Sequence, residues 1–162
     1  MSGTWLLPTA ADTARLGEAL ADTCPWDPPG PRLLFLRGEL GAGKTTLAAA
    51  MLARLGVDEA ARSPSYALIE TYGVRAGLAV HLDCYRLSGP RELEQLGLRD
   101  YFADRTLWLV EWPEKVLGGL PVPDLTLSLA PAGEGRSGVL EALTDVGKAW
   151  CVQVERKLPT HT

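Results

Sequence analysis

The stretch GELGAGKTTLAAAM, from Gly38 to Met51, constrains this chain more than any other part of its 162 residues. It follows the apolar run RLLFL and continues into an alanine-rich segment. The sequence therefore predicts a buried strand over 32–36, a glycine-rich turn, and a helix from Thr45 to Leu55. Glycines permit backbone conformations in which the N–H groups of such a turn point inward, toward an anion. This order is typical of a phosphate-binding loop in an α/β protein.

The loop matches the pattern G-x-x-x-x-G-K-[ST] at all of its fixed positions, which are Gly38, Gly43, Lys44 and Thr45. Lys44 is expected to act on the β- and γ-phosphates, and the Thr45 hydroxyl to ligate Mg²⁺. The N-terminus of the following helix adds the positive end of its dipole. The predicted cofactor-binding residues of the loop are Gly38, Glu39, Leu40, Gly41, Ala42, Gly43, Lys44, Thr45 and Thr46.

Strand-like and helix-like segments alternate along the first two-thirds of the chain. Strands are expected at 4–7, 32–36, 65–72, 78–85 and 106–112, and helices at 9–21, 45–55 and 90–97. A less regular pair of strands is expected at 124–130 and 138–144, while 145–158 fits either a helix or a strand. The pattern predicts an α/β fold of the P-loop NTPase type, a three-layer sandwich whose central sheet has a parallel core and added antiparallel edge strands.

Length and composition restrict the class of protein. We expect one domain over 1–158 and a short tail at 159–162. The formal net charge of −4 gives no general attraction to DNA or RNA. The cysteines are three in number and far apart, which favours buried free thiols in a reducing cytoplasm. The sequence shows neither a signal peptide nor an apolar run long enough for a membrane span.

Two acidic residues end predicted strands and are candidate partners of the loop. Asp83 ends the run LAVHLD, and Glu111 ends the run LWLVE. The carboxyl ends of parallel strands meet at one edge of a sheet, where a phosphate loop also lies. We therefore expect both acids to be catalytic and to hold Mg²⁺, directly or through water, while Glu111 also polarises the attacking water. His81, two residues before Asp83, is interpreted as a packed residue rather than a metal ligand.

The absence of asparagine from the chain bears on the nucleotide. Small GTPases usually read guanine with the asparagine of an N-K-x-D motif, so this chain is expected to bind an adenine nucleotide. The predicted cofactors are ATP and Mg²⁺.

Five linked motifs resemble, in order and spacing, the bacterial TsaE family of small P-loop ATPases. They are GELGAGKTT, SPSYALIETY, HLDCYRL, ELEQLGLRDYF and LVEWPEK. Matching residues are frequent from Gly38 to Lys115, less frequent over the N-terminal helix, and few after Pro123. A phosphate loop alone indicates a superfamily, whereas five linked motifs in about eighty residues indicate this family.

The resemblance implies roles for further positions. Ser65, in the segment SPSY, would belong to a switch that senses the γ-phosphate; the family more often has threonine there, and the hydroxyl is kept. Trp112 would join the nucleotide site beside Glu111. Arg136, in the turn GEGR, is a candidate contact of the nucleotide, and Thr13 is a candidate neighbour of the base.

The resemblance also implies a cellular role. TsaE-like proteins assist a TsaD–TsaB heterodimer that transfers a threonylcarbamoyl group to the adenosine just 3′ of certain tRNA anticodons. They bind ATP, hydrolyse it slowly alone, and are needed for repeated cycles. The implied partner is thus a TsaD–TsaB-like heterodimer, with tRNA reached indirectly through that complex, and with neither DNA nor a membrane involved.

Two other functions also fit the phosphate loop. A small P-loop kinase would need an acceptor pocket and an arginine-bearing lid, and no acceptor motif is visible in the sequence. A nucleotide-gated binding module would bind ATP in the same way, with hydrolysis that is incidental to its role.

Overall fold

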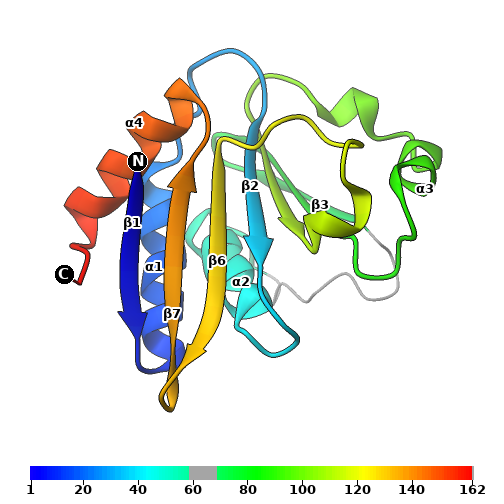
Figure 1. Ribbon diagram of the computed structural model, residues 1–162. Coiled ribbons are helices and arrows are strands. Elements are labelled where there is room, and N and C mark those ends of the chain that lie inside the picture. The colour runs from blue at the N-terminus through cyan, green and yellow to red at the C-terminus, as the bar shows by residue number, and fades with distance from the viewer. Residues whose placement is uncertain (59–68, 162) are drawn as a thin grey trace.

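The computed structural model describes residues 1–58 and 69–161 (Figure 1). Its strands are β1 (Ser2–Leu7), β2 (Arg32–Arg37), β3 (Ile69–Val74), β4 (Gly77–Asp83), β5 (Thr106–Glu111), β6 (Leu125–Ala132) and β7 (Gly135–Ala142). Its helices are α1 (Ala10–Thr23), α2 (Lys44–Arg54), α3 (Pro90–Gln95) and α4 (Asp145–Lys157), with 3₁₀ turns η1 (Leu98–Tyr101) and η2 (Pro113–Val116). The expected strand at 65–72 begins outside the described residues, and its described part belongs to β3.

All seven strands form one sheet in the order β1-β7-β6-β2-β5-β4-β3. The four central strands β6, β2, β5 and β4 run parallel, whereas β7 and β1 on one side and β3 on the other are antiparallel to their neighbours. The predicted fold class is therefore confirmed. The two late strands are more regular than expected, and β6 extends the parallel core because it pairs directly with β2.

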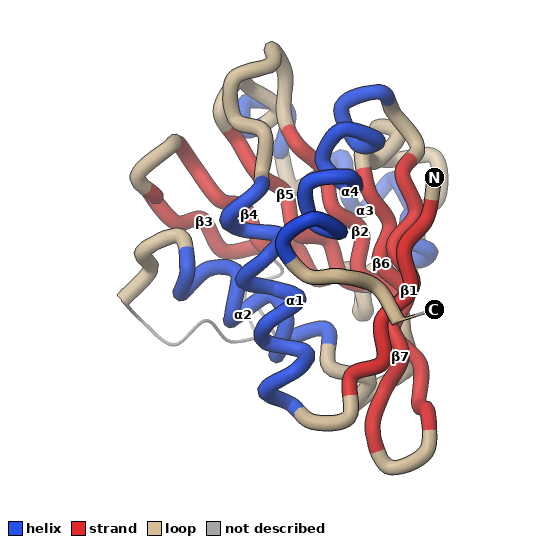
Figure 2. The backbone as a smooth tube through the Cα atoms, turned by 90° about the vertical axis from the view of Figure 1, so that its left-hand side faces the viewer, coloured by secondary structure: helices blue, strands red, loops and turns tan. Residues whose placement is uncertain are grey.

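Helices cover both faces of the sheet, which explains the almost continuous apolar sequence of β2. Leu34 and Leu36 pack in the core beneath α1, α2 and α4, while Leu33 and Phe35 pack in the core that α3, η1 and η2 cover. Figure 2 shows α1 and α2 side by side on the first of these faces. A parallel strand buried on both faces has no polar side to alternate with its apolar one.

The C-terminal segment that fitted either a helix or a strand is the helix α4. Thr144 caps it, because its side chain accepts a hydrogen bond from the Gly147 N–H. Trp150, on the buried face, donates from Nε1 to the Leu20 carbonyl of α1 at 3.2 Å. Beyond α4, the His161 N–H donates to the Thr4 carbonyl, so the described part of the expected tail reaches the edge strand β1.

Cys24, Cys84 and Cys151 are free and buried, as the sequence predicted. Burial raises the pKa of Cys24 and of Cys84 to about 12 and that of Cys151 to about 11. Since the thiolate is the reactive form, these thiols serve as small apolar side chains of the core. No helix within the described ranges is both long and apolar enough to cross a membrane.

Candidate nucleotide-binding site

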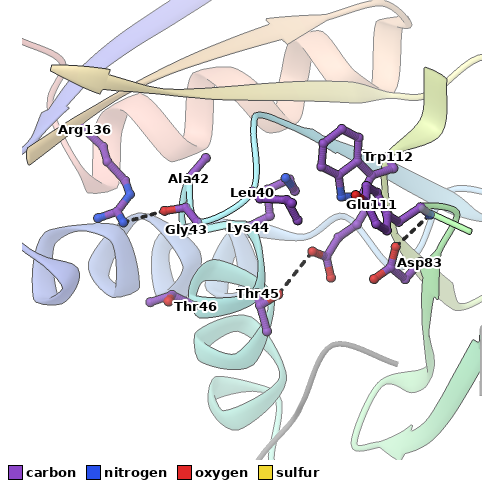
Figure 3. A pocket seen from close by; sticks show the side chains of 12 residues that line it. Leu40, Ala42, Gly43, Lys44, Thr45, Thr46, Asp83, Glu111, Trp112 and Arg136 are labelled. Atoms are coloured by element: carbon purple, nitrogen blue, oxygen red, sulfur yellow. Dashed lines mark hydrogen bonds between the residues drawn. The ribbon is translucent and has the colours of Figure 1, made fainter. Parts of the chain in front are cut away.

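A cavity of about 330 Å³ opens at the carboxyl edge of the parallel strands, between the glycine loop and the ends of β4 and β5 (Figure 3). The residues that line it are Leu40, Gly41, Ala42, Gly43, Lys44, Thr45, Thr46, Asp83, Tyr85, Glu111, Trp112 and Arg136. Most of the site predicted from the sequence is thus brought together in one place. Of the other predicted residues, Gly38, Glu39 and Thr13 lie outside the lining, and Ser65 lies outside the described residues.

Two glycines of the loop, Gly38 and Gly43, are required for different reasons. Gly38 has a φ of 148°, and a Cβ built on it would lie 2.6 Å from the Leu129 carbonyl oxygen. Gly43 has a φ of 104°, in the left-handed region that favours glycine, and it begins α2 as its N-cap residue. These constraints let the loop turn tightly between β2 and α2, so that the N-terminus of α2 faces the cavity.

Lys44, the first residue of α2, is held by the loop that precedes it. Its Nζ donates to the Gly38 carbonyl and, at 3.1 Å, to the Glu39 carbonyl. The Nζ atom also lies 4.1 Å from the centre of the Trp112 ring, a cation–π contact. Burial lowers the pKa of Lys44, while the charge of Glu111 acts in the opposite direction. The site therefore holds an ammonium group in place through two backbone carbonyl acceptors.

The two acids lie side by side at this edge because their strands pair in register, with Asp83 opposite Glu111. The Thr45 hydroxyl donates to Glu111 Oε1 at 3.2 Å, and the Tyr85 N–H donates to Asp83 Oδ1 at 2.9 Å. A hydroxyl and two carboxylates supply the hard oxygen ligands that Mg²⁺ prefers. Within 1–58 and 69–161, no group of three or more His, Cys, Asp or Glu side chains could hold a metal. The hydroxyl of Thr45 and the carboxylates of Asp83 and Glu111 suit Mg²⁺, which is usually bound by one or two carboxylates together with substrate phosphates.

Trp112 follows β5 in a backbone conformation that is unusual for a bulky residue. Its φ of 55° and ψ of 47° are left-handed, and Pro113 comes next. This turn carries the indole over Lys44 and within 4.9 Å of the Tyr85 ring, measured between centroids. Strained residues of this kind gather at functional sites, because the surrounding contacts hold them there. The backbone conformation of Trp112 thus supports, together with the cavity itself, a functional site at this edge of the sheet.

Arg136 and Thr13 reach the loop from the opposite side. Arg136, on β7, donates from Nη2 to the Gly41 carbonyl at 2.7 Å and lines the cavity. Thr13, on α1, is buried behind the loop, with its methyl carbon 3.5 Å from the position that a Cβ of Gly43 would occupy. Arg136 is therefore placed to meet a ligand, whereas a contact between Thr13 and a base remains a prediction.

His81 is a neighbour of the site that sequence reasoning missed, as is Tyr85, which lines the cavity. His81 is buried as expected, but its Nε2 lies 2.6 Å from Glu111 Oε2. A signal was present in the sequence, because His81 and Asp83 are two residues apart on one strand and therefore point to the same face of the sheet. That pattern places the imidazole beneath the acids but does not reveal which of them it contacts.

Comparison with known proteins identifies a family whose matched region contains the whole lining of the cavity. The family model described as threonylcarbamoyl adenosine biosynthesis protein TsaE matches residues 7–137, a range that includes every residue lining the cavity. The Haemophilus influenzae "tRNA threonylcarbamoyladenosine biosynthesis protein TsaE" is 41% identical over 116 residues, covering 72% of this chain and 73% of the relative. The Bacillus subtilis protein of the same name is 32% identical over 127 residues, covering 76% and 78%.

A solved structure extends the likeness to the three-dimensional fold. A crystal structure of Bacillus subtilis YdiB is similar to this chain with a TM-score of 0.78 and 25% sequence identity. The match covers 96% of this chain and 95% of that one. It therefore reaches beyond residue 137, where the family model ends, and includes most of the C-terminal part of the fold.

Proposed function

The chain belongs to the TsaE family of threonylcarbamoyl adenosine biosynthesis proteins, and on this premise we propose that it binds ATP with Mg²⁺ at the glycine loop and hydrolyses the nucleotide. Hydrolysis would serve a partner heterodimer of the TsaD–TsaB kind in the cytoplasm, which transfers a threonylcarbamoyl group to tRNA. In this proposal the chain is not itself the transferase, and it meets tRNA only through the partner complex.

The observation that carries the proposal is the convergence of Lys44, Thr45 and Glu111 on one cavity. The loop amides and the Lys44 ammonium supply positive charge for the phosphates of ATP. The Thr45 hydroxyl and the carboxylates supply oxygen ligands, and Mg²⁺, when bound there, would neutralise charge that develops on the phosphate oxygens. Glu111, at the end of a buried strand, is the residue assigned to orient and polarise the attacking water.

The coupling to a partner is proposed to act through the mouth of the cavity. Leu40 and Tyr85 line it, yet they expose 70% and 42% of their surfaces. An apolar rim around a nucleotide site is a surface that a partner can cover. The nucleotide state would then change what the partner meets, because contacts to a γ-phosphate order neighbouring segments and hydrolysis releases them.

A kinase is disfavoured by the lining of the cavity. Phosphoryl transfer to a second substrate needs charge around the transferred group and a place for the acceptor. Among the described residues that line the cavity, Arg136 is the only arginine, and it is bonded to the Gly41 carbonyl. The phosphate is therefore expected to pass to water.

The proposed function is tested with ATP labelled at its γ-phosphate and with a purified TsaD–TsaB heterodimer. The label is expected in inorganic phosphate, with faster release when the heterodimer is present.

In gel filtration the chain is expected to elute with the heterodimer in Mg·ATP and apart from it in Mg·ADP. Label on another molecule would favour a kinase, and identical elution in both nucleotides would reject nucleotide-controlled docking. Many rounds of tRNA modification supported by a hydrolysis-deficient variant would favour the pure binding module.

A further inference from the structure

His81 lies directly beneath the acids of the site, although it does not line the cavity. It is on β4, opposite Leu109 of β5, and the register places Asp83 opposite Glu111 two residues further on. The side chains of His81 and Glu111 therefore share one face of the sheet and meet diagonally. Their contact, 2.6 Å between Nε2 and Oε2, is buried, with His81 fully enclosed and Glu111 exposed by 2%.

The Glu111 carboxylate is held at both of its oxygens. Oε1 accepts the hydrogen bond from the Thr45 hydroxyl at 3.2 Å, and Oε2 meets the imidazole. A carboxylate bonded at a single oxygen can still swing about its terminal torsions, which are broad. His81 on β4 and Thr45 at the start of α2 restrict this rotation and orient the carboxylate toward the cavity.

The hydrogen-bond network also assigns the imidazole tautomer. Nδ1 of His81 is buried and has no hydrogen-bond partner in the part of the chain that the structure describes. Nε2 faces a carboxylate oxygen at 2.6 Å, a distance at which two facing lone pairs would repel each other. The hydrogen is therefore placed on Nε2, which donates it to Glu111, while Nδ1 keeps its lone pair.

We propose that His81 is a positioning residue that holds the Glu111 carboxylate toward the bound metal and the attacking water. This inference rests on the proposed function, since it concerns the same hydrolysis. It goes further by assigning to a buried side chain, which does not line the cavity, control over how Glu111 performs its role. Residues that hydrogen-bond to a metal-binding carboxylate commonly fix its orientation, and their replacement commonly lowers metal affinity or activity.

The charges around Glu111 indicate what happens when the imidazole is removed. Glu111 and Lys44 attract each other, and the charge of Glu111 opposes the lowering of the Lys44 pKa by burial. A carboxylate freed from His81 would be drawn toward that ammonium and away from the position where water is activated. At saturating Mg²⁺ the nucleotide affinity would change little, because Lys44, Thr45 and the loop amides stay in place.

Two substitutions separate positioning from packing. His81→Leu fills the space but cannot donate, whereas the amide nitrogen of His81→Gln can reach the place of Nε2 and donate to Glu111. We expect His81→Leu to lower kcat by about 10–100-fold with KM for ATP within about threefold of wild type. His81→Gln should recover most of the lost kcat. Equal activity of His81→Leu and wild type, or equal losses in His81→Leu and His81→Gln, would overturn the proposal.

A second readout does not depend on turnover. The concentration of Mg²⁺ that gives half of the thermal stabilisation by ATP is expected to rise about tenfold in His81→Leu. The same substitution should have no further effect in a Glu111→Gln background, since it acts through that carboxylate. A persistent effect in that background would overturn the proposal. If His81→Leu does not fold, His81→Asn replaces it, because the shorter amide reaches Nδ1 but not Nε2.

The outcomes distinguish this proposal from the function on which it rests. If the wild-type chain releases no phosphate from ATP, alone or with the heterodimer, the proposed function fails, whatever the variants do. If the wild type hydrolyses ATP and His81→Leu does so equally well, hydrolysis stands and only the positioning role of His81 is lost.

Discussion

Glu111→Gln is expected to lower ATP turnover by about 10²–10⁴-fold, the range that a positioned acid or base contributes to a reaction. The amide is nearly isosteric and keeps an oxygen for the Thr45 hydroxyl, so the fold and the loop should be retained. It cannot accept a proton from water or bring a negative charge to the metal. At saturating Mg²⁺ the affinity for Mg·ATP should stay within a few-fold of wild type, because Lys44 and Thr45 are unchanged, while phosphate release almost stops.

The matched control for this variant is Glu114→Gln. Glu114 is an exposed acid three residues further along the chain, in η2, and it does not line the cavity. Its neutralisation removes the same charge from the same neighbourhood, so turnover should change by less than about twofold. Phosphate release is measured under single-turnover conditions, with binding measured separately. Equal turnover of Glu111→Gln and wild type would reject the assignment of Glu111.

Lys44→Ala is expected to weaken the binding of Mg·ATP by about 10–100-fold. The ammonium is the one cationic side chain at the start of α2, and a hydrogen bond to a charged group contributes roughly 1.5–3 kcal/mol. Its loss also leaves the Gly38 and Glu39 carbonyls without their present donor. The shift in melting temperature that ATP and Mg²⁺ produce should therefore nearly vanish at nucleotide concentrations that saturate the wild type.

Lys148→Ala is the control for the loss of a lysine. Lys148 lies on α4, is largely exposed, and pairs only with Asp145 at 3.5 Å among the ion pairs of the described residues. An exposed pair of this kind contributes little, so both stability and nucleotide binding should be unchanged. A Lys44→Ala protein that ATP stabilises as strongly as the wild type would show that the nucleotide binds elsewhere.

The sequence predicted those parts of the site that depend on local order. The loop, its strand and its helix are adjacent in the chain, so one motif describes all three. Asp83 and Glu111 could be placed because parallel strands bring their carboxyl ends to one edge, a rule that needs only the strand assignments. The continuous apolar runs of the strands, alternating with helix-like segments, likewise predicted a sheet that lies between layers of helices.

What the sequence could not predict depends on contacts between distant segments. The pairing of β6 with β2, the position of β1 beside β7, and the helical state of 145–157 all depend on how the sheet assembles. The contact between His81 and Glu111 requires the register of two strands, which a single sequence does not specify. The left-handed backbone at Trp112 is held by packing around it and opposes the local preference of the residue before a proline.

The most direct test of the whole account is a calorimetric titration of Mg·ATP into the purified wild-type chain. We predict saturable heat that fits one site per chain, and a large loss of affinity when EDTA removes Mg²⁺, because oxygen ligands of the cavity and the phosphates share the metal. The absence of saturable heat from the correctly folded chain, or binding that is equally tight without Mg²⁺, would contradict the account.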